Sequence, residues 1–154
     1  MYPILLALHS LTRWLVLVAI VIVLYRSYRG WLGNRGYSRL DNRIRHIAAT
    51  VLHIQLVIGL WLYIISPVTN YFLHHFKEAV HLREIRFFGM EHSFMMLTGI
   101  VVITIGSAKA KRQQTPRAKF KTQAIWFTIG LLIILSSIPW AFSPLTHRPW
   151  LRSF

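Results

Sequence analysis

The stretch RFFGMEHSFMMLTGIVVITIG, residues 86–106, is an apolar run that is long enough to cross a lipid bilayer as a helix. It nevertheless carries a carboxylate and an imidazole side by side, at Glu91 and His92. Ionisable groups inside a spanning helix are costly, and for this reason they usually mark a functional site. Glu91 and His92 are therefore the first candidate site residues, and we expect the other spans to bring partners to their level.

Three further apolar stretches of similar length predict three more spanning helices. The four predicted spans are approximately residues 3–25, 44–66, 86–106 and 122–142. With 154 residues, 55% hydrophobic residues and a mean hydropathy of +0.46, the chain is too apolar for an ordinary soluble domain and too short for two. The predicted fold class is all-α, an integral membrane four-helix bundle that forms one transmembrane domain over residues 1–154.

Basic residues predict the orientation of these spans. The formal charge is +14, and most of the 18 Lys and Arg lie in two connecting segments, residues 26–45 and 107–121. The positive-inside rule places both segments in the cytoplasm and both termini on the outer, periplasmic side. Such segments suit anionic lipid head groups better than nucleic acid. We expect a multi-pass protein of the bacterial inner membrane without a cleavable signal, and we expect Gly30, Gly33 and Gly36 to break any helix in the first connection.

The absence of cysteine removes several kinds of cofactor site. The chain has no cysteine. Disulfides, thiolate metal sites, iron–sulfur clusters and covalently attached c-type haem are therefore excluded. A haem would be held by imidazoles, without a covalent bond.

Depth along the spans distinguishes the histidines. Counted inward from the outer edge at about 1.5 Å per residue, His9 lies about 10 Å deep and His92 about 9 Å deep, whereas His53 lies about 19 Å deep. Two axial ligands of one iron must lie at nearly the same level, so the count favours His9 and His92. His46 lies beside Arg45 near the membrane edge, and we interpret it as an interfacial histidine.

Small residues on the third span allow two interpretations. His92, Gly99 and Gly106 recur every seven residues along one helix face. Glycines in such a row let either a flat macrocycle or a neighbouring helix come close. Helix packing is the commoner reason for this pattern.

An arginine accompanies the first histidine. Arg13 follows His9 by four residues, on the same helix face, and it needs a counter-charge in a low-dielectric environment. Glu91 would supply that charge in an ion pair that locks two helices. A haem propionate would supply it in a cofactor site.

A third set of polar residues lies between the second and third spans. Residues 68–85 predict a short amphipathic helix with His74, Glu78 and His81 on one face. Three such groups could hold a metal ion, although an interfacial helix needs no metal to explain its histidines.

Four segments resemble a family of small four-span bacterial membrane proteins that are catalogued as b-type cytochromes. The segments are LHSLTRWLVL (8–17), HIQLVIGLWLYIISP (53–67), EHSFMMLTGIVVITIGSAKAKR (91–112) and SSIPW (136–140). The motif positions of the family fall on His9, Arg13, Trp14, His53, Gln55, Gly59, Glu91 and His92. The resemblance implies haem b in a four-helix bundle, with a link to a quinone or to a respiratory assembly.

Together these features predict a b-type cytochrome that holds one haem b toward the outer face and transfers single electrons, rather than a stand-alone enzyme. The expected ligands are His92 and His9, with His53 as a substitute ligand or as a hydrogen-bonding group at a quinol site. Arg13 would neutralise a propionate, and Glu91 would orient an imidazole or take up a proton. Two alternatives stay open: a non-redox accessory subunit of a larger membrane complex, and a copper or other metal carrier.

Overall fold

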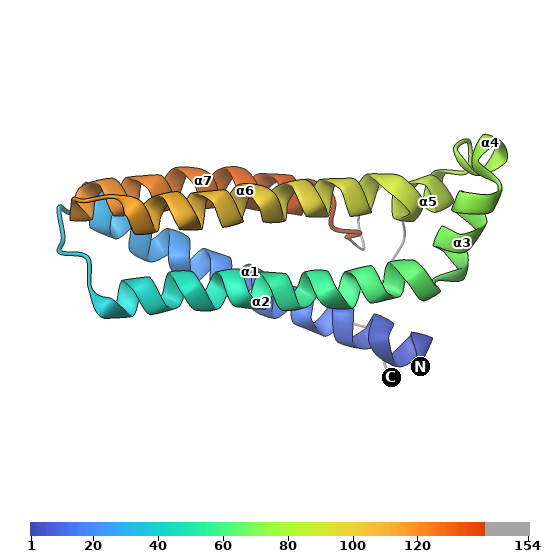
Figure 1. The fold of residues 1–154 in the computed structure, drawn as a ribbon, viewed down its shortest axis with the longest axis horizontal. Helices are drawn as coiled ribbons and strands as arrows, with labels where there is room; N and C mark the ends of the chain where they lie inside the picture. The colour runs from blue at the N-terminus through green and yellow to red at the C-terminus, as the bar shows by residue number, and fades with distance from the viewer. Residues whose placement is uncertain (141–154) are drawn as a thin grey trace.

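The computed structural model describes residues 1–140, and all the regular elements in this part are helical (Figure 1). The elements are α1 Tyr2–Leu32, α2 Arg39–Ile65, α3 Pro67–His74, α4 Phe76–Ala79, α5 Arg83–Arg86, the π-helix η1 Phe87–Glu91, α6 His92–Arg112 and α7 Pro116–Ser136. The last two residues of the expected fourth span, 141–142, lie outside the described part.

Four of these helical stretches are long and apolar enough to cross a membrane. They are Tyr2–Leu32, Arg39–Ile65, Arg83–Arg112 and Pro116–Ser136, where the third combines α5, η1 and α6. The predicted all-helical chain with four apolar spans is therefore confirmed, and length and composition indicate a multi-pass membrane protein.

The long helices lie side by side, and neighbours along the chain run in opposite directions (Figure 1). Helix α1 packs against α2 and α7, and α6 packs against α7 and α2. Helices α1 and α6 therefore face each other across the interior.

Apolar side chains cover both the inside and the outside of this arrangement. The buried core includes Ile20, Ile103 and Phe127. Large apolar residues such as Val57 and Ile64 are more than half exposed on the outer surface. A helix that is apolar all round is typical of a membrane span, because lipid rather than water covers its outer face.

The two basic connections are shorter than expected. Helix α1 continues to Leu32, and the connection turns at Asn34, which has a φ of 48°. Gly30 does not break the helix, contrary to expectation, because it lies inside α1 and leaves room for the ring of Phe120 from α7. Helix α2 begins with a capping box between Ser38 and Asp41.

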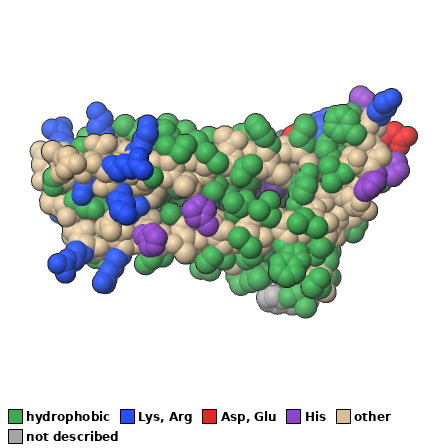
Figure 2. Space-filling model, in the orientation of Figure 1, with side chains coloured by type: hydrophobic (Ala, Val, Ile, Leu, Met, Phe, Trp, Pro, Cys, Tyr) green, Lys and Arg blue, Asp and Glu red, His purple; other side chains and the backbone are tan. Residues whose placement is uncertain are grey.

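Both short connections, residues 33–38 and 113–115, lie at one end of the molecule, which we call the basic end (Figure 1). Figure 2 shows most of the visible Lys and Arg side chains gathered there. The opposite end carries α3, α4, α5 and η1, together with His9 and His92, and we call it the histidine end.

The expected amphipathic helix over residues 68–85 is interrupted. Helix α3 ends at His74, and His75 has φ −126° and ψ 42°, which is not helical. His74, Glu78 and His81 therefore do not share one helix face, and the spacing argument for a metal site fails. The Nδ1 atom of His74 instead donates to the carbonyl oxygen of Asn70, at 2.9 Å.

Candidate functional site

The imidazole rings of His9 and His92 meet in the interior at the histidine end. His9 comes from α1 and His92 is the first residue of α6. Their ring centroids are 6.5 Å apart and the ring planes are inclined at 76°. Both side chains are half-buried. The equal depth that the residue count gave for these two histidines is consistent with this contact.

The π-helix η1 determines where His92 points. It covers Phe87–Glu91, immediately before His92, and the Ser93 hydroxyl donates to the carbonyl oxygen of Phe88, five residues back, at 3.2 Å. Tyr63 donates to the carbonyl oxygen of Gly89 at 2.8 Å, and the Phe72 ring fills the space beside this glycine. Single π-turns inside α-helices are often found at functional sites.

A backbone carbonyl fixes the tautomer of His92. Its Nδ1 atom lies 2.8 Å from the carbonyl oxygen of Ser137, just after α7. A carbonyl can only accept, so Nδ1 carries the proton, and in the neutral ring Nε2 keeps a lone pair. Metal-binding histidines typically donate their other ring nitrogen to a carbonyl or carboxylate in this way.

Helix α2 gives His9 both support and space. The Gln55 amide donates to the carbonyl oxygen of His9 at 2.9 Å, and its side-chain oxygen accepts from the Thr12 hydroxyl. A Cβ atom on Gly59 would lie 3.1 Å from Cε1 of His9, so glycine leaves room for this ring. The buried Nδ1 atom of His9 has no hydrogen-bond partner within residues 1–140. Buried nitrogens without a hydrogen-bond partner are uncommon in stable structures, so this atom is a candidate for ligand binding.

Glu91 pairs with Arg86 and not with Arg13. The Nε atom of Arg86 lies 2.7 Å from Oε1 of Glu91, and the Arg86 guanidinium also donates to the carbonyl oxygen of Val80. Of the two alternatives for the counter-charge of Arg13, the ion pair with Glu91 is therefore not formed. The reason is the π-turn, which brings residues five apart onto one face.

The Arg13 guanidinium lies over the indole ring of Trp14, 5.4 Å from its centroid. Trp14 in turn meets the ring of Trp140 edge-on, with centroids 6.2 Å apart. Arg13 is half-buried and lies one turn toward the basic end from His9.

His53 stands apart from the His9–His92 pair. It is exposed on the outer surface, and its Nε2 atom lies 3.0 Å from the Thr104 hydroxyl. That hydroxyl donates to the carbonyl oxygen of Ile100 at 2.7 Å, so it accepts from His53. Nε2 then carries the proton, and Nδ1 presents a lone pair at the surface.

The glycines of the third span serve helix packing. A Cβ atom on Gly99 would lie 2.8 Å from Ile134 and 3.3 Å from the carbonyl oxygen of Gly130, both in α7. The Trp126 side chain, also in α7, fills the space beside Gly106. The packing interpretation therefore holds for Gly99 and Gly106, where side chains of α7 leave no room for a macrocycle.

The His9–His92 pair offers two nitrogen donors, fewer than a bare metal ion usually takes from a protein. Within the described residues, no group of three or more His, Asp and Glu side chains converges. Two imidazole nitrogens that flank one metal are about 4 Å apart. The ring centres lie farther out on each side, so a centroid separation of 6.5 Å is compatible with such a pair. A haem needs only two protein ligands, because its ring supplies the others.

Comparisons with protein-family models, with curated proteins and with solved structures find no match to this chain. The functional argument therefore rests on the residues and their geometry.

Sequence reasoning did not identify several residues that build the site. The π-turn leaves no mark in apolar periodicity, and the Ser137 acceptor is a backbone atom that any residue would provide. Gln55 was named as a motif position of the resemblance, and it also carried a signal of its own, because an amide within an apolar span needs a partner.

Proposed function

We propose that the chain is a membrane-bound b-type cytochrome: a four-helix bundle of the bacterial inner membrane, with both termini outside, that holds one haem b and transfers single electrons. The observation that carries the proposal is the convergence of His9 and His92 from facing helices, 6.5 Å apart, with the tautomer of His92 set by Ser137.

In this proposal His9 and His92 would hold the haem through their neutral imidazoles. When it is bound, the haem supplies a one-electron oxidation and reduction. Two imidazole ligands would favour electron transfer over oxygen chemistry. The Ser137 carbonyl orients the His92 ring, and Gln55 holds the backbone of α1 at His9.

The two charged residues have different roles in the proposal. Arg13 lies one helical turn from His9 and would neutralise a haem propionate. Glu91, which pairs with Arg86, fixes the entry of the third span and thereby the position of His92. A proton-accepting role for Glu91 is no longer needed.

His53 would serve a quinol rather than the iron. Its exposed position in an apolar span faces lipid, and its Nδ1 atom offers a lone pair there. A membrane-soluble quinol has hydroxyl groups that can donate to such an acceptor. We therefore assign His53 to hydrogen bonding with a quinol. A redox protein or a respiratory complex would be the other partner with which the chain exchanges electrons.

An absorption spectrum of the purified full chain tests the proposal directly. Protein from haem-replete cells should show a b-type difference spectrum between its dithionite-reduced and oxidised forms, and His92→Ala should abolish it. His46→Ala is the matched control, because His46 is exposed on α2 near the basic end. A colourless wild-type preparation would reject the cytochrome and favour a non-redox accessory subunit.

A further inference from the structure

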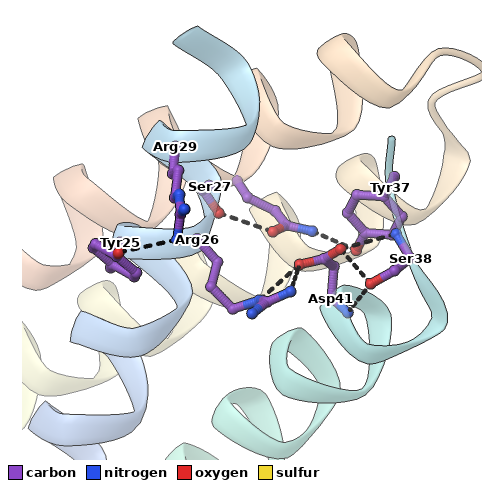
Figure 3. A network of polar contacts seen from close by, with 8 residues as sticks. Tyr25, Arg26, Ser27, Arg29, Tyr37, Ser38 and Asp41 are labelled. Atoms are coloured by element: carbon purple, nitrogen blue, oxygen red, sulfur yellow. Dashed lines mark hydrogen bonds and ion pairs between the residues drawn. The ribbon is translucent and has the colours of Figure 1, made fainter. Parts of the chain in front are cut away.

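A second candidate site lies at the basic end, in a cavity of about 190 Å³. Its walls include Arg26 and Arg29 from α1, Arg35 from the connection, Asp41 from α2 and Phe120 from α7. Figure 3 shows Arg26 reaching toward Asp41, with Arg29 and Tyr25 beside it on α1. Three arginines thus surround one small space.

The carboxylate in this cavity is already fully engaged. Asp41 is 5% exposed, and its Oδ1 atom lies 2.7 Å from a guanidinium nitrogen of Arg26. Its Oδ2 atom accepts from both the backbone N–H and the hydroxyl of Ser38. Asp41 therefore holds Arg26 in the wall of the cavity and leaves no acceptor for the other arginines.

Arg29 and Arg35 remain as uncompensated charges. Within residues 1–140 the ion pairs are Arg26–Asp41 and Arg86–Glu91, so neither Arg29 nor Arg35 is paired with an acid. Arg29 donates to the neutral hydroxyl of Tyr25 at 3.2 Å. The backbone N–H of Arg35 donates to the carbonyl oxygen of Gly30 at 3.1 Å, which anchors its Cα at the end of α1.

We propose that this cavity binds the phosphate group of an anionic lipid, with Arg29 and Arg35 as the donors. Guanidinium groups match phosphate oxygens with two parallel hydrogen bonds. Asp41, the acid that lines the cavity, is engaged by Arg26 and Ser38 and does not compete for them. The cavity lies where an apolar span meets a basic connection, which is the level of lipid head groups. Free phosphate has the same chemistry and is the other possible source.

Retention of lipid by the purified full chain tests the site. Native mass spectrometry in detergent should show phosphatidylglycerol bound in preference to phosphatidylcholine. Arg29→Gln combined with Arg35→Gln should lower phosphatidylglycerol retention about tenfold. The matched control is Arg39→Gln with Arg43→Gln, because these exposed arginines carry the same charge at the same end without lining the cavity.

The control should change retention by less than about twofold. An equal loss in both double variants would show a diffuse charge effect and overturn the site, as would a wild type without lipid preference. If the glutamine variant does not fold, Arg29→Lys with Arg35→Lys keeps both charges but removes the bidentate geometry. It should lose about threefold, and unchanged retention would overturn the assigned donors.

A thermal-stability measurement separates the two phosphate sources. Phosphatidylglycerol and inorganic phosphate are added separately, the latter against chloride at equal ionic strength. Stabilisation by the lipid alone assigns the site to a lipid, and stabilisation by both assigns it to the phosphate group in either form. Stabilisation by inorganic phosphate alone rejects the lipid, and stabilisation by neither overturns the proposal.

Discussion

The two ends of the molecule use polar side chains in opposite ways. Inside the basic end most of them satisfy one another: Ser27 donates to Gln123 at 2.9 Å, Gln123 donates to Tyr37, and Arg26 pairs with Asp41. The exception among the described residues there is a donor, the Nε atom of Arg45. At the histidine end the polar groups of the pair do not satisfy each other, since Nδ1 of His9 finds no partner in the described residues. Mutual satisfaction stabilises a fold, whereas an unpartnered buried nitrogen is available to a ligand.

The sharpest test of this contrast compares two histidines. His9→Ala should lower the haem content of the purified protein more than about tenfold, because it would remove one of the two proposed haem ligands. His53→Ala should leave the haem content nearly unchanged, because His53 is bonded to Thr104 on the outer surface. The haem-to-protein ratio, taken from absorbance, measures the haem content of both variants. Haem loss in the His53 variant alone would make His53 the ligand in place of His9.

The space beside His9 offers the next largest effect. Gly59→Leu should lower haem content about tenfold, because the new side chain competes with the His9 ring for its position. Gly36→Leu is the control, since a Cβ atom there meets nothing within 4 Å. Equal haem in both variants would argue against a ligand role for His9 in its present position.

The support of His9 by α2 has a smaller predicted effect. Gln55→Leu removes the amide that donates to the His9 carbonyl and should weaken haem binding about threefold. The variant should also shift the midpoint potential, which a loss of general stability would not do. Gln114→Leu, at an exposed position of the second connection, should change neither quantity.

At the basic end the expected change is in stability, with the haem content unaffected. Asp41→Ala removes the partner of Arg26 and one half of the capping box, and should lower the free energy of unfolding by about 1–3 kcal/mol. Chemical unfolding in detergent measures this change, with Glu78→Ala, an exposed acid of the other end, as the control. Loss of haem in the Asp41 variant would show that the two ends are coupled.

The smallest effect is a dependence on alkaline pH. Burial raises the pKa of the Tyr37 phenol above its usual value, so the fold favours the neutral form. Its contribution to stability is complete below pH of about 10 and is lost as the pH rises through the raised pKa. Tyr37→Phe should therefore flatten the alkaline loss of stability by less than about 1 kcal/mol, whereas Tyr28→Phe, at an exposed tyrosine, should not.

Counting along the chain was enough to find the spans and to give His9 and His92 similar depths, because an α-helix rises by a constant length per residue. The same count could not find the partner of Glu91, because the π-turn changes the spacing that places residues on one face. The sequence also predicted connections that are longer than those in the structure. A glycine such as Gly30 indicates a helix break only if no neighbouring side chain occupies the space beside it. Here the Phe120 ring occupies that space, so Gly30 lies inside the helix.

The π-turn at Phe87–Glu91 also affects how this chain should be aligned with others. Such a turn contains one residue more than an α-turn, and each residue rotates a helix by about 100°. A protein of the same design with a regular helix here would need its imidazole one position closer to the counterpart of Arg86. An alignment of this region therefore needs a one-residue gap. Without the gap, equivalent histidines of the two proteins would fall in different columns.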